Sequence, residues 1–296
     1  MTSSSGQKYL GGAARRRGEP PSFSGILRCG LIGENIGRSR LAKALDIMTQ
    51  DHGGRLIFTP IDTASEIGFD FGTTIERLMA EGWTGVTVTH PWKTHAANWA
   101  GPAMIRGTKD LGAANTLLFQ PVAGHNTDYS GFLAAWPAIL DRAPGRVAVA
   151  GAGGVARAVV PALKTLGATE IVIWDLDRSA ADALAQQTGT TAVDAGDAAR
   201  AAEAADGLVN CTPLGMAPDT ASAFDPAWIT GQGWAFDAVY TPTNTPFLRA
   251  ARAKGLATMS GFDLFRYMAM ESFTAYTGLV PDAVTTLPKL DALKPE

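Results

Sequence analysis

The sequence predicts an α/β fold in two units, and three observations support it. The chain has 296 residues, of which 46% are hydrophobic and 18% charged, which suits one large or two ordinary globular domains. Short apolar runs alternate with helix-length amphipathic segments along most of the chain. A glycine-rich turn, GAGGVA at residues 151–156, directly follows one of these runs. Together they predict an N-terminal α/β substrate domain followed by a Rossmann dinucleotide-binding domain.

The first part of the chain is expected to hold an arm and the substrate domain. Residues 1–23 lack the apolar core of a secretory signal and are interpreted as a flexible arm. Its arginines at 15–17 could contact nucleic acid or a targeting receptor, but a short solvated charge run is the simpler interpretation. The substrate/catalytic domain is expected over 24–127, with strands at 26–32, 56–59, 85–89 and 115–119 and helices at 40–50 and 73–82.

The dinucleotide-binding domain is expected over 128–258, and its regular alternation begins after a polar junction at 141–145. Strands are predicted at 147–150, 170–174, 207–210 and 234–238, with helices at 155–166 and 180–187. Strands separated by helix-length segments predict a parallel, doubly wound sheet. The C-terminal helical segment, 259–296, is expected to return to the substrate domain.

Composition and charge favour a small-molecule partner. The formal net charge is -3, so no broad basic surface is indicated for nucleic acid. No apolar run reaches the roughly 20 residues needed to span a bilayer. Cys29 and Cys211 are far apart in sequence, which argues against a disulfide framework and for a reducing, cytoplasmic location. His90 and His95 have no third ligand in the sequence pattern, so no metal site is predicted, and the oligomeric state stays open.

The glycine-rich turn matches the dinucleotide fingerprint G-x-G-x-x-G/A. Gly151 would allow the tight turn, Gly153 the close approach of a pyrophosphate, and Ala156 the close packing of the following helix. The N-terminus of that helix offers N–H donors and a favourable dipole to phosphates. The cofactor-binding loop is therefore predicted to comprise Gly151, Ala152, Gly153, Gly154 and Val155.

An acidic residue follows the next predicted strand. Asp175 lies 24 positions after Gly151, where a carboxylate can accept hydrogen bonds from ribose hydroxyls and would repel a 2'-phosphate. This favours NAD as the cofactor. Arg178 keeps NADP possible, because a guanidinium nearby could bind the extra phosphate. The alternative is an ordinary strand–helix turn at 151–156 with Asp175 opening a solvated loop.

Two ionisable side chains follow strands of the first unit. Lys93 lies just past the run 85–89, and Asp128 begins a helical segment after another strand and turn. A lysine and an aspartate that converge beside a nicotinamide could handle the proton of a substrate hydroxyl while hydride moves to the cofactor. The alternative for Lys93 is a solvated lysine at the end of a strand.

Several motifs, in one consistent order, resemble the shikimate dehydrogenase family, including its quinate/shikimate branch. The resemblance covers nearly the whole chain after the arm. It rests on GLIG followed by Arg38–Ser39, on GVTVTHPWK at 85–93, and on ANT and NTD around 114–116 and 126–128. In the second half it rests on NCTPLGM at 210–216, DAVYTP at 237–242 and the Gly261 loop.

This resemblance implies a reversible, NAD(P)-dependent oxidation of a ring hydroxyl in a shikimate/quinate-type ring carboxylate. Lys93 and Asp128 would be the catalytic pair. Thr212 and Gly261 would join the cofactor site, and the substrate-facing residues would be Ser39, Thr87, Thr89, Asn115, Tyr240 and Met268. Two alternatives are a dehydrogenase for a different ring carboxylate and a non-catalytic, nucleotide-dependent regulatory protein on the same fold.

Three positions depart from the pattern of the family. Leu41 stands where a second serine hydroxyl is usual, Thr87 where an asparagine is usual, and Met268 where a glutamine is usual. These changes predict a ring carboxylate recognised differently from shikimate itself. The side chains considered as replacement contacts for the substrate carboxylate are Arg38, Arg40 and Tyr267.

Overall fold

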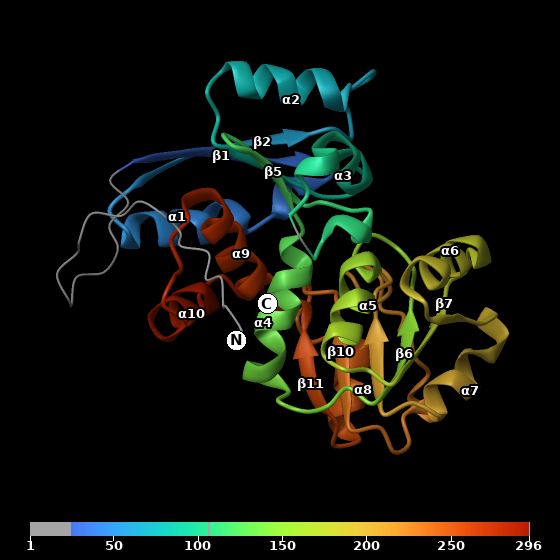
Figure 1. Cartoon of the computed structure of the whole chain (residues 1–296). Coiled ribbons are helices and arrows are strands. Elements are labelled where there is room, and N and C mark those ends of the chain that lie inside the picture. Colours follow the sequence, from blue (N-terminus) through green and yellow to red (C-terminus); the bar gives the residue numbers. More distant parts are fainter. Residues whose placement is uncertain (1–24, 106, 296) are drawn as a thin grey trace, which may run out of the picture.

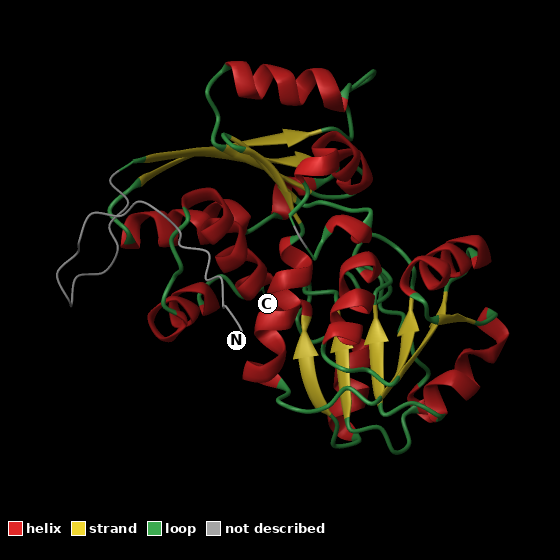
Figure 2. Cartoon of the chain, viewed as in Figure 1, coloured by secondary structure: helices red, strands yellow, loops and turns green. Residues whose placement is uncertain are grey.

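The computed structural model describes residues 25–105 and 107–295, which form two β-sheets with helices on their faces (Figures 1 and 2). The predicted arm, with its three arginines, lies outside the described residues. The predicted α/β class, with a parallel sheet in the second unit, is confirmed. None of the helices within 25–105 and 107–295 is long and apolar enough to cross a membrane.

The first sheet has five strands in the order β2-β1-β3-β4-β5. Its strands β2, β1 and β3 pair in parallel, while β4 runs antiparallel to both β3 and β5. The bounds are β1 Ile26–Gly33, β2 Arg55–Asp62, β3 Gly85–Val88, β4 Thr116–Phe119 and β5 Val122–His125. Strand β5 was not predicted, because its four residues include a glycine and a histidine and show no period-two pattern.

Side chains of β1 alternate between two cores. Leu27 and Cys29 pack with helix α1 (Leu41–Asp51), whereas Ile32 packs with the opposite cluster below α2 (Phe71–Ala80) and α3 (Lys93–Ala100). Both faces of the sheet are therefore covered by helices, which leaves the carboxyl ends of the parallel strands as the place for a ligand.

The second sheet has six parallel strands in the order β11-β10-β9-β6-β7-β8. The bounds of the strands are β6 Arg146–Ala150, β7 Glu170–Trp174, β8 Thr191–Ala192, β9 Gly207–Asn210, β10 Trp234–Asp237 and β11 Ala257–Ser260. The helices are α5 Ala156–Thr165, α6 Arg178–Thr188, α7 Ala198–Glu203 and α8 Pro246–Ala253. The strand order reverses between β6 and β9, and such switch points bind nucleotides in open α/β sheets.

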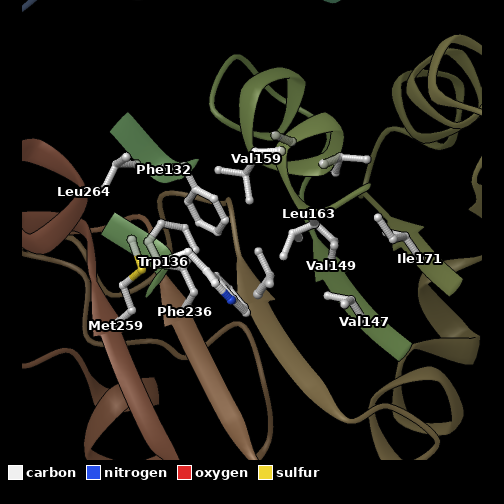
Figure 3. Close-up of a cluster of buried hydrophobic side chains, with 14 of the residues drawn as sticks. Phe132, Trp136, Val147, Val149, Val159, Leu163, Ile171, Phe236, Met259 and Leu264 are labelled. Carbon is white, nitrogen blue, oxygen red and sulfur yellow. The ribbon is translucent and has the colours of Figure 1, made fainter. Parts of the chain in front are cut away.

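Two helices connect the units. Helix α4 (Thr127–Ile139) inserts Phe132 and Trp136 into the core of the second sheet, where Figure 3 shows them beside Phe236. Helix α9 (Gly261–Thr277) contributes side chains to the cores of both units and is followed by α10 (Ala283–Asp291). Figure 1 shows α4 and α9 side by side between the sheets.

The contact between α4 and α9 depends on one glycine. A Cβ added at Gly131 would lie 2.6 Å from the backbone nitrogen of Met268, closer than side-chain carbons approach backbone atoms. The two helices therefore pack backbone against backbone, which requires the absence of a side chain at this position.

Candidate active site

A lysine and an aspartate meet at the edge of the first unit. Lys93 is the first residue of α3, and Asp128 lies in the first turn of α4. Lys93 Nζ donates to Asp128 Oδ2 at 2.6 Å, and the two side chains are only 14% and 11% exposed. An amine and a carboxylate held this way, largely shielded from water, can pass a proton to and from a bound hydroxyl.

The backbone around Lys93 is fixed from two directions. Thr89 N donates to Ile32 O at 2.8 Å, which continues the β3–β1 ladder beyond β3. The Trp92 indole donates to Thr63 Oγ1 at 2.8 Å, which ties the segment to the end of β2. The lysine is thus presented by a rigid loop and not by a free surface turn.

Asp128 is fixed by the start of its helix. The side chain of Asn126 caps α4 by accepting from Tyr129 N at 3.1 Å, and it also donates to Ala113 O at 2.9 Å. The first turn of α4 is therefore anchored to the segment that precedes β4.

A buried polar network lies beside the pair. Asn115 Oδ1 accepts from Thr127 N at 2.7 Å and from Thr127 Oγ1 at 3.0 Å, and Thr127 Oγ1 lies 2.8 Å from Ser272 Oγ on α9. The Asn115 oxygen is committed to α4, so the amide nitrogen is the part of this side chain suited to donate to a ligand. Thr127 and Ser272 were not assigned from the sequence, although Thr127 stands inside the NTD motif.

Ser39 lies in a loop that the structure anchors firmly. Asp62 accepts from Asn35 N and from Ile36 N, both at 3.0 Å, and so holds the loop against the end of β2. Ser39 Oγ accepts from Leu41 N at 3.3 Å. Leu41 itself is 2% exposed within the core around α1 and α9, so it packs inside the unit and does not line a pocket.

Thr87 and Met268 are turned toward partners within the protein. Thr87 Oγ1 lies 2.8 Å from the hydroxyl of Tyr276, and both side chains are buried. Burial raises the pKa of Tyr276 well above its usual value, which keeps this phenol neutral. Met268 Sδ accepts from Ser272 Oγ at 3.5 Å. Thr89 lies between Thr87 and Lys93 and is partly buried.

Tyr240 extends from the second unit toward the first. Its ring stacks on Phe265 of α9, with centroids 5.7 Å apart and planes at 18°. Burial raises the pKa of Tyr240, and the positive charge of Arg40 counteracts part of that increase. Three side chains were considered as replacement contacts for the substrate carboxylate. Of these, Arg38 is exposed and Tyr267 lies in the core, whereas the charge of Arg40 reaches Tyr240.

The glycine-rich turn has the shape that a dinucleotide requires. Gly151 has φ 94°, and a Cβ there would lie 2.9 Å from the Cys211 backbone. A Cβ at Gly153 would meet no atom within 4 Å, so the backbone is open to a ligand. At Gly154 a Cβ would lie 3.8 Å from Lys93 Cδ, which places the turn beside the catalytic candidate.

The helix that follows the turn keeps its N-terminus free for an anion. Helix α5 has Val155 at its N-cap, no side-chain cap and no acidic residue in its first turn. Its first N–H groups and its dipole are thus suited to a pyrophosphate, and the residues present fit a bound dinucleotide.

Asp175 and Arg178 lie at the end of β7 and the start of α6. Asp175 Oδ2 accepts from Ala152 N at 2.7 Å, so the carboxylate also braces the glycine-rich turn. Arg178 pairs with Asp182 at 2.9 Å and with Asp194 at 2.6 Å. The hydrogen bonds that Arg178 donates to these two carboxylates raise its pKa. The guanidinium is therefore directed toward acidic neighbours.

The remaining two cofactor candidates lie at the ends of β9 and β11. Thr212 N and Oγ1 both donate to Asn210 Oδ1, at 2.9 and 2.7 Å. Gly261 begins α9, where an added Cβ would collide with the carbonyl oxygen of Ala238. Among residues 25–105 and 107–295, no group of three or more His, Cys, Asp or Glu side chains could hold a metal ion.

The chain is similar to known dehydrogenases over most of its length. Residues 146–230 match a family model described as NADP oxidoreductase coenzyme F420-dependent. The chain is 35% identical to a quinate/shikimate dehydrogenase (NAD(+)) of Corynebacterium glutamicum strain R, over 86% of this chain and 94% of that protein. It is 32% identical to a shikimate dehydrogenase (NADP(+)) of Arthrobacter sp. strain FB24, over 86% and 90%.

Solved structures show the same relationship. The quinate dehydrogenase from Corynebacterium glutamicum in complex with NAD superposes with a TM-score of 0.84 at 33% identity, covering 90% of this chain and 99% of that one. The shikimate 5-dehydrogenase from Thermus thermophilus, in complex with NADP(H) and shikimate, gives 0.78 at 30% identity with the same coverage. The chain therefore belongs to the quinate/shikimate dehydrogenase family of NAD(P)-dependent oxidoreductases.

Proposed function

We propose that the protein catalyses the reversible oxidation of a ring hydroxyl in a shikimate/quinate-type cyclic hydroxy acid, with NAD as the preferred cofactor. The observation that carries this proposal is the Lys93–Asp128 pair, joined at 2.6 Å and largely buried. A Cβ added at Gly154, in the dinucleotide turn, would lie 3.8 Å from Lys93 Cδ. Proton-transfer groups and the cofactor loop thus meet at one place.

The residues of the chain divide the reaction between them. When bound, NAD supplies the acceptor for the hydride that leaves the substrate carbon. Lys93 Nζ, as the neutral amine, accepts the proton of the hydroxyl on that carbon and becomes an ammonium; in the reverse direction the ammonium returns the proton. Asp128 keeps the amine in place through the hydrogen bond it accepts. Asn115, with its oxygen held by Thr127, donates its amide N–H to a substrate oxygen.

Two side chains of the candidate site favour a ring carboxylate other than shikimate as the preferred substrate. The Thr87 hydroxyl is engaged with Tyr276, and Met268 offers a thioether where an amide would form two hydrogen bonds. We infer that Arg40, whose charge reaches Tyr240, contributes to binding of the carboxylate together with Ser39.

The preference for NAD rests on charge. Asp175 follows β7, and a carboxylate at the end of this strand is suited to accept hydrogen bonds from ribose hydroxyls and to repel a phosphate. Arg178, the group that could neutralise such a phosphate, is paired with Asp182 and Asp194.

We further propose that the substrate domain spans 24–127, the dinucleotide domain 128–258 and the returning helical segment 259–296.

Steady-state kinetics on a panel of ring acids tests the proposal. Shikimate, quinate and less hydroxylated cyclohexene and cyclohexane carboxylates would each be measured with NAD and with NADP, following nicotinamide absorbance. We expect turnover with at least one ring acid and higher kcat/KM with NAD. An absence of turnover with every acid, while NADH still binds, would favour the non-catalytic alternative.

A further inference from the structure

A buried asparagine–aspartate pair joins two loops at the ligand-binding edge of the second sheet. Asn210 ends β9 and Asp237 ends β10, and both side chains are fully buried. Asn210 Nδ2 donates to Asp237 Oδ1 at 2.9 Å. We propose that this pair, named here the strand-end brace, positions the cofactor loop and the Tyr240 loop relative to each other and thereby couples cofactor binding to substrate binding.

Asn210 controls the loop on the cofactor side. Its Oδ1 accepts from both the backbone and the hydroxyl of Thr212, while its Nδ2 also donates to Leu214 O at 3.2 Å. The glycine-rich turn rests on this loop, because a Cβ at Gly151 would lie 2.9 Å from the Cys211 backbone. A shift of Asn210 would therefore displace the surface on which the dinucleotide turn rests.

Asp237 controls the loop on the substrate side. Its Oδ1 accepts from Val239 N at 3.0 Å, next to Tyr240, and its Oδ2 accepts from Thr245 Oγ1 at 2.6 Å. Thr245 in turn caps α8 by accepting from Leu248 N at 3.2 Å. The aspartate thus closes the loop 237–245 at both of its ends, and Tyr240 projects from between them.

The position and the chemistry of the pair indicate more than a fold-stabilising role. A buried carboxylate is costly unless hydrogen bonds satisfy it, and several apolar side chains of similar size would fill a sheet end at lower cost. Both oxygens of Asp237 are nevertheless satisfied by groups of the two loops, and β9 and β10 are neighbours beside the switch point. The arrangement fixes loop geometry at the edge where ligands bind.

The test compares variants of the brace with a matched buried amide just outside the opposite end of the same sheet. Gln232 precedes β10 at its opposite end, is 5% exposed, and makes hydrogen bonds with Ala202 O, Trp228 O and Thr230 N. Asn210→Ala, Asp237→Ala and Gln232→Ala would each be measured for stability, for the dissociation constant of NADH by fluorescence titration, and for the KM of the ring acid that the native protein uses.

For Asn210→Ala and Asp237→Ala we expect the NADH dissociation constant and the substrate KM each to rise by about tenfold or more, because the two loops lose the contact that holds them in their binding geometry. Gln232→Ala should lose stability while both constants stay near native values. Asp237→Asn should restore both constants, because its amide oxygen can serve Asn210 and Val239 while its nitrogen donates to Thr245. Asn210 and Asp237 lie outside the site. A purely structural role for them would not raise the NADH dissociation constant and the substrate KM together.

The inference is overturned if the brace variants lose stability but keep native NADH and substrate constants, as Gln232→Ala should, or if Asp237→Asn fails to restore them. Should Asp237→Ala not fold, Asn210→Ser decides the question by the same comparison with Gln232→Ala. The inference rests on the proposed function only for the substrate constant. NADH binding is measured without turnover, so an inactive native protein would contradict the proposed function and leave the NADH comparison intact.

Discussion

Replacing Lys93 with methionine should separate catalysis from cofactor binding. The change keeps the stem of the side chain and removes the amine that donates to Asp128 at 2.6 Å. General acid–base catalysis contributes about 10²- to 10⁴-fold, so turnover should fall by about two to four orders of magnitude. At about 1.4 kcal/mol per tenfold change, this corresponds to roughly 3 to 6 kcal/mol of transition-state stabilisation.

Cofactor binding should change little in the same variant. Lys93 approaches the dinucleotide turn with a methylene, since a Cβ added at Gly154 would lie 3.8 Å from Lys93 Cδ. Gly154 has no such carbon, so the lysine stem makes at most weak van der Waals contact with the turn, at about 0.1 to 0.2 kcal/mol for each pair of carbons, and methionine retains part of the stem. The dissociation constant of NADH should therefore stay within about twofold of the native value.

The assay combines steady-state turnover of the best ring acid with NADH fluorescence titration and chemical denaturation. Lys43→Met, an exposed lysine on α1, serves as the control for loss of one positive charge. Asp128→Asn should also lower turnover, and it should destabilise the fold, because it leaves a mostly buried ammonium without its carboxylate. Near-native turnover in Lys93→Met, or an NADH constant that rises in step with lost turnover, would refute the reasoning.

Four further outcomes are expected. Asp175→Ser should narrow the NAD preference. Adding Asp194→Asn should narrow it further, because this change removes one of the two carboxylates that pair with Arg178; an equal ratio of kcat/KM for NAD and for NADP in the single and double variants would contradict this. Met268→Gln should improve the use of shikimate, by about five- to a hundred-fold if one buried substrate hydroxyl regains a partner, and kinetics on native and variant proteins checks this. Gly131→Ala should lower the free energy of unfolding by about 1–3 kcal/mol through overpacking against Met268, and urea denaturation measures it. Burial raises the pKa of Asp237 from 3.8 to about 6, so the stability that its protonated form contributes is complete below pH 4 and is lost as pH rises through 6. The free energy of unfolding of Asp237→Asn, relative to that of the native protein, should therefore increase by about 3 kcal/mol across this range. A difference that does not change with pH would contradict the assignment.

Much of the fold could be predicted from local sequence patterns. The strands at 170–174 and 207–210 were predicted at their observed bounds, because runs of buried residues between helix-length segments have few other structural interpretations. The glycine-rich turn could also be predicted from the sequence, since its three small residues meet the steric requirements of a local turn. These features depend on neighbours in sequence.

The hydrogen-bond partners of the site residues could not be predicted from local sequence patterns. Thr87 meets Tyr276 across 189 positions, and Thr127 meets Ser272 across 145. The periodicity of the last helix indicates an apolar face, but it does not determine which turn lies opposite which strand. That register is set by close packing at Gly131, which a sequence pattern presents only as a small residue inside a helix.

The same helix contact bears on how relatives of this protein could be recombined. Helix α4 begins with a catalytic candidate tied to the first sheet and continues into the aromatic core of the second. A crossover inside α4 would join the first turn of the helix, from one parent, to the part that packs in the core of the second sheet, from another parent. Gly131 and the Met268 backbone would then come from lineages that never adapted to each other. Functional chimeras should therefore take α4 and α9 from the same parent, which requires two breakpoints, one in the loop at 141–145 and one before α9 begins at Gly261.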